Sequence, residues 1–377
     1  MSEVQAPAVA AAKPKPLQVV VISLSRHRRG GVATVLNTLA DAGFFTNGIC
    51  HHSSCGDGVK LVKFFSALRQ WLSFAWRLGR SRPDLVHIHF SSDMSFWRKV
   101  PYMLLLHQRR IPLVLHVHPS HFWDYVQSRH GWVKRFIVAL LRRSDAVIFA
   151  NRALIERFRL LLPKQRLYHV HNPIDTRLFP FSRNGRREQA LFLGAVLKGK
   201  GVYDIVRAAP LVLAQRPHCR FVFCGDHEID KLRQTVQEHG LQDHFEIHPW
   251  VDYAEKKRLL AESSLLLLPS YSEGFPVVVL EAMASGLPVI TTPVGGMAEA
   301  LQDGAEVLFV EPANPTLLAE RTIHLLEHAD LQQRLAERAL AYVQRHCVEQ
   351  VIQRTMAIYQ EIAAGAAAGP RRSGKSV

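Results

Sequence analysis

Two glutamates eight positions apart, Glu273 and Glu281, stand in a setting that suggests chemistry. Glu281 interrupts the apolar run 277–283, and Glu273 lies in the polar segment just before that run. Ionised carboxylates are rarely buried without a partner. Two adjacent hydroxyls of a sugar would donate charge-assisted hydrogen bonds to such a carboxylate, worth about 1.5–3 kcal/mol each. Taken singly, Glu273 could instead complement a helix dipole, and Glu281 could pair with an arginine.

The surrounding stretch predicts the elements that position these glutamates. Residues 265–268 are four leucines, typical of a buried parallel strand. A loop follows, and we expect a helix with Ser272 as its N-cap and Pro276 in its first turn, ending near Ser285. Residues 289–292 predict the next strand. The helix N-terminus then points out of the carboxyl edge of the sheet, where anionic ligands bind in open α/β sheets.

The spacing of these glutamates, followed by Val294-Gly295-Gly296, resembles the Glu-x7-Glu signature of the retaining glycosyltransferases of family 4. That resemblance implies an α/β protein of the GT-B fold, with two Rossmann-like domains facing across a cleft. It also implies that Glu273 contacts the donor sugar and that Glu281 holds the nucleotide ribose. The backbone after the first glutamate would face the donor diphosphate: Gly274, Phe275, Pro276 and Val277.

Two further segments match the family's diphosphate-binding parts. Lys200 corresponds to the lysine of the family's Gly-Arg-Leu-x3-Lys-Gly motif, which binds the diphosphate. Ala195 stands where that motif has arginine, and Lys198 is a candidate to compensate, although it could equally be a solvated loop lysine. The pair Gly30-Gly31, between a predicted strand and a predicted helix, would face the diphosphate from the other side of the cleft. Alone, such a pair indicates only a turn.

Two apolar segments that predict strands, 85–90 and 113–118, carry histidines at alternate positions: His87, His89, His116 and His118. Alternate residues of a strand share a face, so these side chains could form a metal site. No carboxylate completes a recognisable ligand set, and we predict no metal. The resemblance makes His118 a candidate catalytic residue that orients the acceptor or stabilises the departing sugar. A core histidine is the alternative.

The length of 377 residues indicates two domains. The five cysteines are sparse and odd in number, as in a protein with reduced thiols. Pattern and resemblance together divide the chain as follows: a disordered tail at 1–16, an acceptor-binding Rossmann-like domain at 17–180 completed by a C-terminal helix at about 345–363, a nucleotide-sugar-binding Rossmann-like domain at 190–342, and a loose tail at 365–377.

The positive charge is concentrated in the first half of the chain. Residues 1–180 hold 26 Lys and Arg against 9 Asp and Glu, giving +17, while residues 181–377 hold 21 against 23, giving −2. Such asymmetry suggests an anionic partner for the first half. Residues 60–82 are basic and aromatic, with helical character. They could form an interfacial membrane helix or a crossover helix packed on the sheet, and one helix could do both.

Nucleic acid is not favoured as that anionic partner, because no recognition motif appears and the basic residues are dispersed. No apolar stretch approaches the roughly 18–20 residues of a transmembrane helix, and residues 1–16 do not read as a signal peptide. Bacterial enzymes of similar sequence often extend lipid-linked glycans at the cytoplasmic membrane. We therefore expect a cytoplasmic protein, peripheral on the inner face of the cell membrane.

The expected reaction is transfer of a hexosyl group, with retention, from a UDP-hexose or GDP-mannose. The acceptor would be a glycan or a polyprenyl-diphosphate-linked glycan, in surface polysaccharide or glycolipid synthesis. We predict no cofactor and no metal, because the sequence lacks an Asp-x-Asp motif. Two alternatives stay open: a nucleotide-sugar epimerase or hydrolase of the same fold, and a non-catalytic accessory subunit, which Ala195 alone favours.

Overall fold

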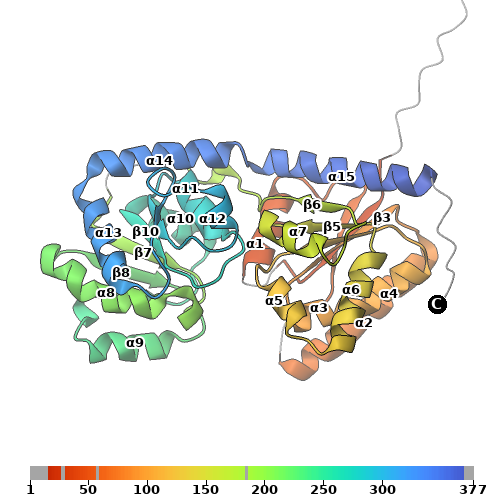
Figure 1. Cartoon of the computed structure of the whole chain (residues 1–377), viewed down its shortest axis with the longest axis horizontal. Coiled ribbons are helices and arrows are strands. Elements are labelled where there is room, and N and C mark those ends of the chain that lie inside the picture. The colour runs from red at the N-terminus through yellow and green to blue at the C-terminus, as the bar shows by residue number, and fades with distance from the viewer. Residues whose placement is uncertain (1–15, 27–29, 57–58, 183–185, 369–377) are drawn as a thin grey trace, which may run out of the picture.

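The structure is a computed structural model that describes residues 16–26, 30–56, 59–182 and 186–368. The predicted tail at 1–16 therefore lies outside the described residues except for Pro16. Two lobes lie side by side, each built on one parallel sheet with helices around it (Figure 1). This confirms the predicted α/β architecture of two Rossmann-like domains. None of the five cysteines forms a disulfide.

The first sheet has the strand order β2-β1-β3-β4-β5-β6, and every neighbouring pair in it is parallel. Apolar residues point to both faces of its central strands, because helices cover both faces. Its strands are β1 (Val19–Ser23), β2 (Ile49–Ser53), β3 (Leu85–Phe90), β4 (Leu113–Val117), β5 (Ala146–Phe149) and β6 (Leu167–His169).

The second sheet has the order β12-β11-β10-β7-β8-β9 and is also parallel throughout. Its strands are β7 (Gln189–Leu193), β8 (Arg220–Cys224), β9 (Phe245–His248), β10 (Leu265–Leu268), β11 (Val289–Thr291) and β12 (Leu308–Phe309). The helices around it are α8 (Val202–Gln215), α9 (Ile229–Glu238), α10 (Tyr253–Glu262), α11 (Val277–Ala284), α12 (Gly296–Ala300), α13 (Pro315–Glu327) and α14 (Ala329–Gln344). Short 3₁₀ turns precede α8 and β9, at η2 (Lys198–Lys200) and η3 (Gln242–His244).

Helices cover the two faces of the first sheet unequally. One face packs against α2 (Lys60–Arg80), α3 (Met94–Trp97), α4 (Val100–Gln108), α5 (Phe122–Gln127), α6 (Gly131–Arg143) and α7 (Arg152–Arg159). The other face packs against α1 (Gly31–Asp41) and α15 (Val348–Ala368). The chain leaves this domain through η1 (Thr176–Leu178). Figure 1 shows α14 and α15 as one long blue edge, with α15 lying along the first domain although the chain reaches it last.

Two local predictions were wrong. Helix α11 begins at Val277 with Pro276 at its N-cap position, so Ser272 does not cap it. The segment Ser270–Pro276 is an irregular loop with bends, and other residues hold it as described below. The tail predicted from Gly365 is helical as far as Ala368. Alanines around Gly365 favour helix strongly enough to offset that glycine.

Candidate active site

A cavity of about 560 Å³ lies between the two sheets, at the carboxyl ends of their strands. Loops after β1 and β4 line it from the first domain, and loops after β7, β8, β9 and β10 line it from the second. All ten residues that the sequence suggested for catalysis or donor binding line this cleft: Gly30, Gly31, His118, Lys200, Glu273, Gly274, Phe275, Pro276, Val277 and Glu281. The structure brings these residues together, and their individual roles stay predictions.

Glu273 is almost fully buried and is held by two hydrogen bonds to one oxygen. Lys200 donates from Nζ to Oε1 of Glu273 at 2.5 Å, and the hydroxyl of Ser270 donates to the same oxygen at 2.8 Å. Ser270 is itself buried directly after β10, so the strand end determines where the carboxylate lies. The arrangement places a carboxylate and an ammonium side by side at the cleft, where each could contact a different part of one ligand.

Glu281 lies on the buried side of α11. Burial raises the pKa of its carboxyl above the ordinary value, whereas the nearby ammonium of Lys256 acts in the opposite direction. Lys256, on α10, donates a hydrogen bond from Nζ to Oε1 of Glu281. The alternative that Glu281 pairs with a cation is therefore what the structure shows, with lysine in the place of arginine. The same carboxylate still lines the cleft.

A pair of glycines after β11 holds the loop that carries Glu273. A Cβ on Gly295 would lie 1.9 Å from the carbonyl oxygen of Glu273, and the φ of Gly295 is 57°, so only glycine fits there. The amide of Gly296 donates to the carbonyl of Gly274 at 2.6 Å. The glycine pair thus fixes the backbone between Glu273 and α11, whose first residues line the cleft. A helix N-terminus carries free amide groups and a positive dipole end.

Gly30 and Gly31 stand on the other side of the cleft, where α1 begins. Gly30 has a φ of 124°, and a Cβ added to either glycine would meet no atom within 4 Å among those described. These glycines therefore leave open space in front of the helix N-terminus instead of permitting a close packing contact. The preceding residues 27–29 lie outside the described part of the chain.

The turn that carries Lys200 packs on the end of β10. A Cβ on Gly201 would lie 2.1 Å from the carbonyl oxygen of Pro269, and the φ of Gly201 is 72°. Lys200 consequently points to Glu273. Lys198, in the same 3₁₀ turn, is absent from the described lining of the cleft, whereas Ala195 is part of it. The suggestion that Lys198 compensates for the missing arginine therefore gains no support from this geometry.

His118 follows β4 and lines the cleft. Its Nε2 lies 2.9 Å from Nδ1 of His89, and the two rings are stacked. Burial lowers the pKa of His118 to about 4, so the imidazole is neutral at pH 7. A neutral ring can accept a hydrogen bond from an acceptor hydroxyl or donate one to a sugar oxygen.

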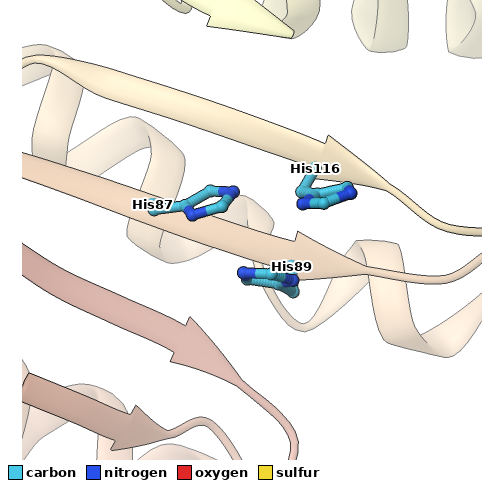
Figure 2. A group of neighbouring side chains, drawn as sticks. All are labelled: His87, His89 and His116. Atoms are coloured by element: carbon cyan, nitrogen blue, oxygen red, sulfur yellow. The ribbon is translucent and has the colours of Figure 1, made fainter. Parts of the chain in front are cut away.

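Behind His118, the histidines on one face of β3 and β4 form a buried cluster (Figure 2). Single ring nitrogens of His87, His89 and His116 all lie within 4.8 Å of one another. The hydroxyl of Tyr359, on α15, lies 2.7 Å from Nδ1 of His87. The group contains no carboxylate to balance a dication, and the ammonium of Lys99 acts on His89 with the same sign as a metal would. The absence of a metal stays a prediction.

Three polar contacts join the two domains beside the cleft. The side-chain amide of Asn172 donates to the carbonyl of Phe275 at 2.8 Å, and the hydroxyls of Ser120 and Ser272 lie 3.2 Å apart. On α12, the carboxylate of Glu299 accepts from the first amide groups of α7, those of Arg152 and Ala153, both at 2.9 Å. Each contact ties a loop of one domain to the segment that carries the glutamates or follows it.

Sequence reasoning missed Lys256 and these interdomain residues. Lys256 sits in an amphipathic helix beside a second lysine, a pattern typical of a solvated face. Nothing in the sequence shows that the side-chain amide of Asn172 reaches Phe275. These contacts depend on how the two sheets, which are formed by different parts of the chain, are oriented relative to each other.

The fold and the cleft define the GT-B class of glycosyltransferases. The model of Glycosyltransferase Family 4 matches residues 18–178, and that of Glycosyl transferases group 1 matches residues 174–341. Together the two matches span both sheets, and the chain belongs to the group 1 glycosyltransferases of family 4. The members of this family are enzymes that take nucleotide sugars as donors. The two family matches confirm the resemblance seen in the sequence.

Individual relatives are distant. The chain is 27% identical over 280 residues to an uncharacterized glycosyltransferase of Methanocaldococcus jannaschii, covering 74% of this chain and 76% of the relative. It is 27% identical over 297 residues to N-acetyl-alpha-D-glucosaminyl L-malate synthase of Bacillus anthracis, covering 75% and 76%. The structure of Anabaena HepE in complex with UDP-glucose superposes with a TM-score of 0.73 at 18% identity, over 92% of this chain and all of that one.

Proposed function

We propose that the protein transfers a hexosyl group from a nucleotide sugar to a glycan or lipid-linked acceptor, with retention and without a metal. The observation that carries this proposal is the convergence of Lys200, Glu273, Glu281 and the N-terminus of α11 on one cleft. These groups supply, in order, a cation, two acceptors for hydroxyl groups, and oriented amides. A nucleoside diphosphate sugar needs this set.

We assign the roles from the family resemblance, and the position of each group in the cleft is compatible with them. Glu281 accepts the ribose hydroxyls, and Lys200 with the amides at the start of α11 stabilises the leaving diphosphate, work that a metal does elsewhere. Gly30 and Gly31 leave space for that diphosphate on the opposite wall. Glu273 orients the sugar, and neutral His118 orients the acceptor or stabilises the departing sugar from the first domain.

The experiment is incubation of the purified protein with UDP-glucose, other UDP-hexoses or GDP-mannose, and with candidate glycan and polyprenyl-diphosphate-linked acceptors. Anabaena HepE has been crystallised with UDP-glucose, which makes that sugar the first to test. Proton NMR of the product should show an α-linkage when the donor is α-linked, with EDTA leaving the rate unchanged. Inversion, a requirement for divalent metal, epimerised donor or donor hydrolysis alone would each contradict the proposal.

We further propose that helix α2 attaches the enzyme to the anionic inner face of the cell membrane, where a lipid-linked acceptor resides. Among the described residues, no helix combines the length and apolar character needed to cross a bilayer. Phe74 and Leu78 of α2 pack into the core of the first domain, as a crossover helix requires. Another set of apolar side chains, 45–71% exposed, lies on or beside the same helix: Val59, Leu61, Val62, Phe64, Phe65, Leu68, Leu72 and Trp76.

The charge of α2 also supports the proposal that this helix contacts the membrane. The helix carries lysine and arginine and no acidic residue. The guanidinium of Arg80 lies 3.5 Å from the centre of the Trp76 ring. Large exposed apolar patches on a soluble surface mark contact sites, and a basic helix with exposed Phe and Trp suits the interface of an anionic bilayer. The two interpretations of residues 60–82 are therefore compatible.

A further inference from the structure

Lys256 is a cleft residue without a role so far. Among the described residues that line the cleft, Lys200 and Lys256 are the ones that carry a lysine or arginine side chain. Ala195 supplies no charge where the family has arginine, and Lys198 lies outside the lining. Within the described part of the chain, the positive charge at the donor site therefore comes from two ammonium groups. Lys200 contacts Glu273, and Lys256 contacts Glu281.

The surroundings of Lys256 hold its ammonium at Glu281. The side chain of Lys256 is 18% exposed and that of Glu281 is 4% exposed, so the contact is shielded from water. The ring centres of Tyr253 and Phe179 lie 4.8 and 5.8 Å from Nζ of Lys256. Cation–π attraction from two rings and a charge-assisted hydrogen bond restrict the ammonium to this place. The Lys256 side chain therefore has a restricted position beside Glu281.

The consequence for Glu281 is electrostatic. A carboxyl as buried as this one would favour its neutral form without a cation beside it. A neutral carboxyl is a weak partner for the hydroxyls of a sugar, since the charge-assisted part of each hydrogen bond is lost. Lys256 contacts only Oε1, and Oε2 accepts no hydrogen bond from the described residues. One oxygen is thus paired inside the protein, and the other is left for a ligand.

We propose that Lys256 is a positioning residue for the nucleotide ribose, acting through Glu281. Its ammonium lies against one carboxylate oxygen of Glu281 and favours the charged form of that group, so that the other oxygen can accept the ribose hydroxyls. This inference rests on the assignment of Glu281 to the ribose in the proposed function. It assigns to this chain a lysine–glutamate unit at the ribose end of the donor, separate from Lys200 at the diphosphate end.

The test measures binding of UDP by isothermal titration calorimetry and binding of uridine by displacement. Lys256→Met should weaken both by the same factor, roughly 10-fold or more, the loss typical of a charged hydrogen bond. Equal loss is expected because uridine contains the ribose and lacks phosphate. Lys256→Arg keeps the charge and should recover much of the affinity. Lys257→Met is the matched control, since Lys257 is the next residue of α10 and lies by the same Tyr253 ring.

A double-mutant cycle separates this role from a general structural one. Glu281→Gln removes the charge that Lys256 serves, so Lys256→Met should cause no further loss of affinity in the Glu281→Gln protein. Thermal unfolding without ligand identifies any variant that fails to fold. The doubly substituted protein leaves no unpaired buried charge, so its affinity for UDP can be measured even if a single variant is unstable. Additive losses, a loss confined to UDP, or unchanged binding in Lys256→Met would each overturn the inference. If the unaltered protein binds neither UDP nor GDP, the proposed function itself fails.

Discussion

At the scale of single residues, the cleft pairs each glutamate with a lysine from a different element. Lys200 comes from the turn after β7 and Lys256 from α10, whereas both glutamates flank the start of α11. In the unliganded protein Lys200 is neutralised by Glu273. In the proposed reaction, a bound diphosphate would share that ammonium. The contact with Glu273 would then hold the Lys200 ammonium close to the leaving group before the reaction begins.

The first prediction concerns Lys200. Lys200→Ala should lower kcat by roughly 10²–10³-fold, the usual loss for one preorganised group that stabilises developing charge. Steady-state kinetics with whichever sugar nucleotide proves to be the donor is the measurement. Lys198→Ala is the matched control, because Lys198 shares the same 3₁₀ turn but does not line the cleft. Full activity in Lys200→Ala, or equal loss in both variants, would contradict the assignment.

The second prediction separates the glutamates. Glu281→Ala should weaken binding of the free nucleoside diphosphate, because it removes the ribose contact. Glu273→Ala should leave that binding nearly intact and depress turnover, because Glu273 is assigned to the sugar alone. Calorimetric titration of both variants with UDP or GDP decides between these outcomes. Equal weakening would mean that the division of roles is wrong.

The sequence could predict the residues that stand in one contiguous motif and could not predict their partners. Glu281 was found because a charged residue in an apolar run is unusual, and Glu273 because it stands eight positions before Glu281 in the same motif. Lys256 lies 25 positions from Glu281, and on its own helix it is an ordinary lysine. Whether Lys198 or Lys200 faces the cleft depends on the turn at Gly201, where the chain meets Pro269.

At the scale of elements, the strands were predictable and the start of α11 was not. Runs such as Leu265–Leu268 identify buried parallel strands directly. The residue at which α11 begins depends on Gly295 and Gly296, which hold the preceding loop by backbone contacts. A serine four residues before Pro276 resembles a local cap, but Ser272 instead meets Ser120 of the other domain. Contacts between domains override the local signal here.

The third prediction concerns α2. Replacing Phe64 and Phe65 with serine should reduce sedimentation with vesicles of anionic lipid at low salt, because both rings are exposed on the basic helix. Raising the salt concentration to about 1 M should release the unaltered protein, since the Debye length falls from about 10 Å at 0.1 M to about 3 Å.

Trp132→Ser provides the control for this experiment, because Trp132 is also an exposed aromatic residue, on α6 of the same domain. Competition with DNA distinguishes lipid from nucleic acid, which would show the same salt dependence. If the unaltered protein does not sediment with anionic vesicles at low salt, the membrane proposal is wrong, and a soluble acceptor becomes the better hypothesis. If Trp132→Ser lowers binding as much, α2 is not the attachment site.

At the scale of the whole molecule, buried histidines make stability depend on pH. Burial lowers the pKa of His118 to about 4 and places those of His87, His89 and His116 well below the ordinary value. In the unfolded chain histidine titrates near pH 6.5. Between these values the unfolded chain binds more protons than the folded protein, so stability falls as the pH drops below about 6.5.

The fourth prediction follows from this difference. For a group shifted as far as His118, the free energy of unfolding should be about 2 kcal/mol lower at pH 5 than at neutral pH. Urea unfolding at pH 7.5, 6 and 5 measures the effect. His116→Leu removes one of the titrating groups and should make the dependence on pH shallower. Stability that is unchanged down to pH 5 would show that these rings bind protons as readily in the folded protein as in the unfolded chain.

The path of the chain has a consequence for how the protein is made. One face of the first sheet is closed by Val348, Val351, Ile358 and Tyr359 of α15, which leave the ribosome after the entire second domain. During synthesis the part of this face that α1 does not cover stays open until α15 is made, while the chain grows at roughly 5–20 residues per second. The second domain can therefore complete its own core before α15 closes the first domain.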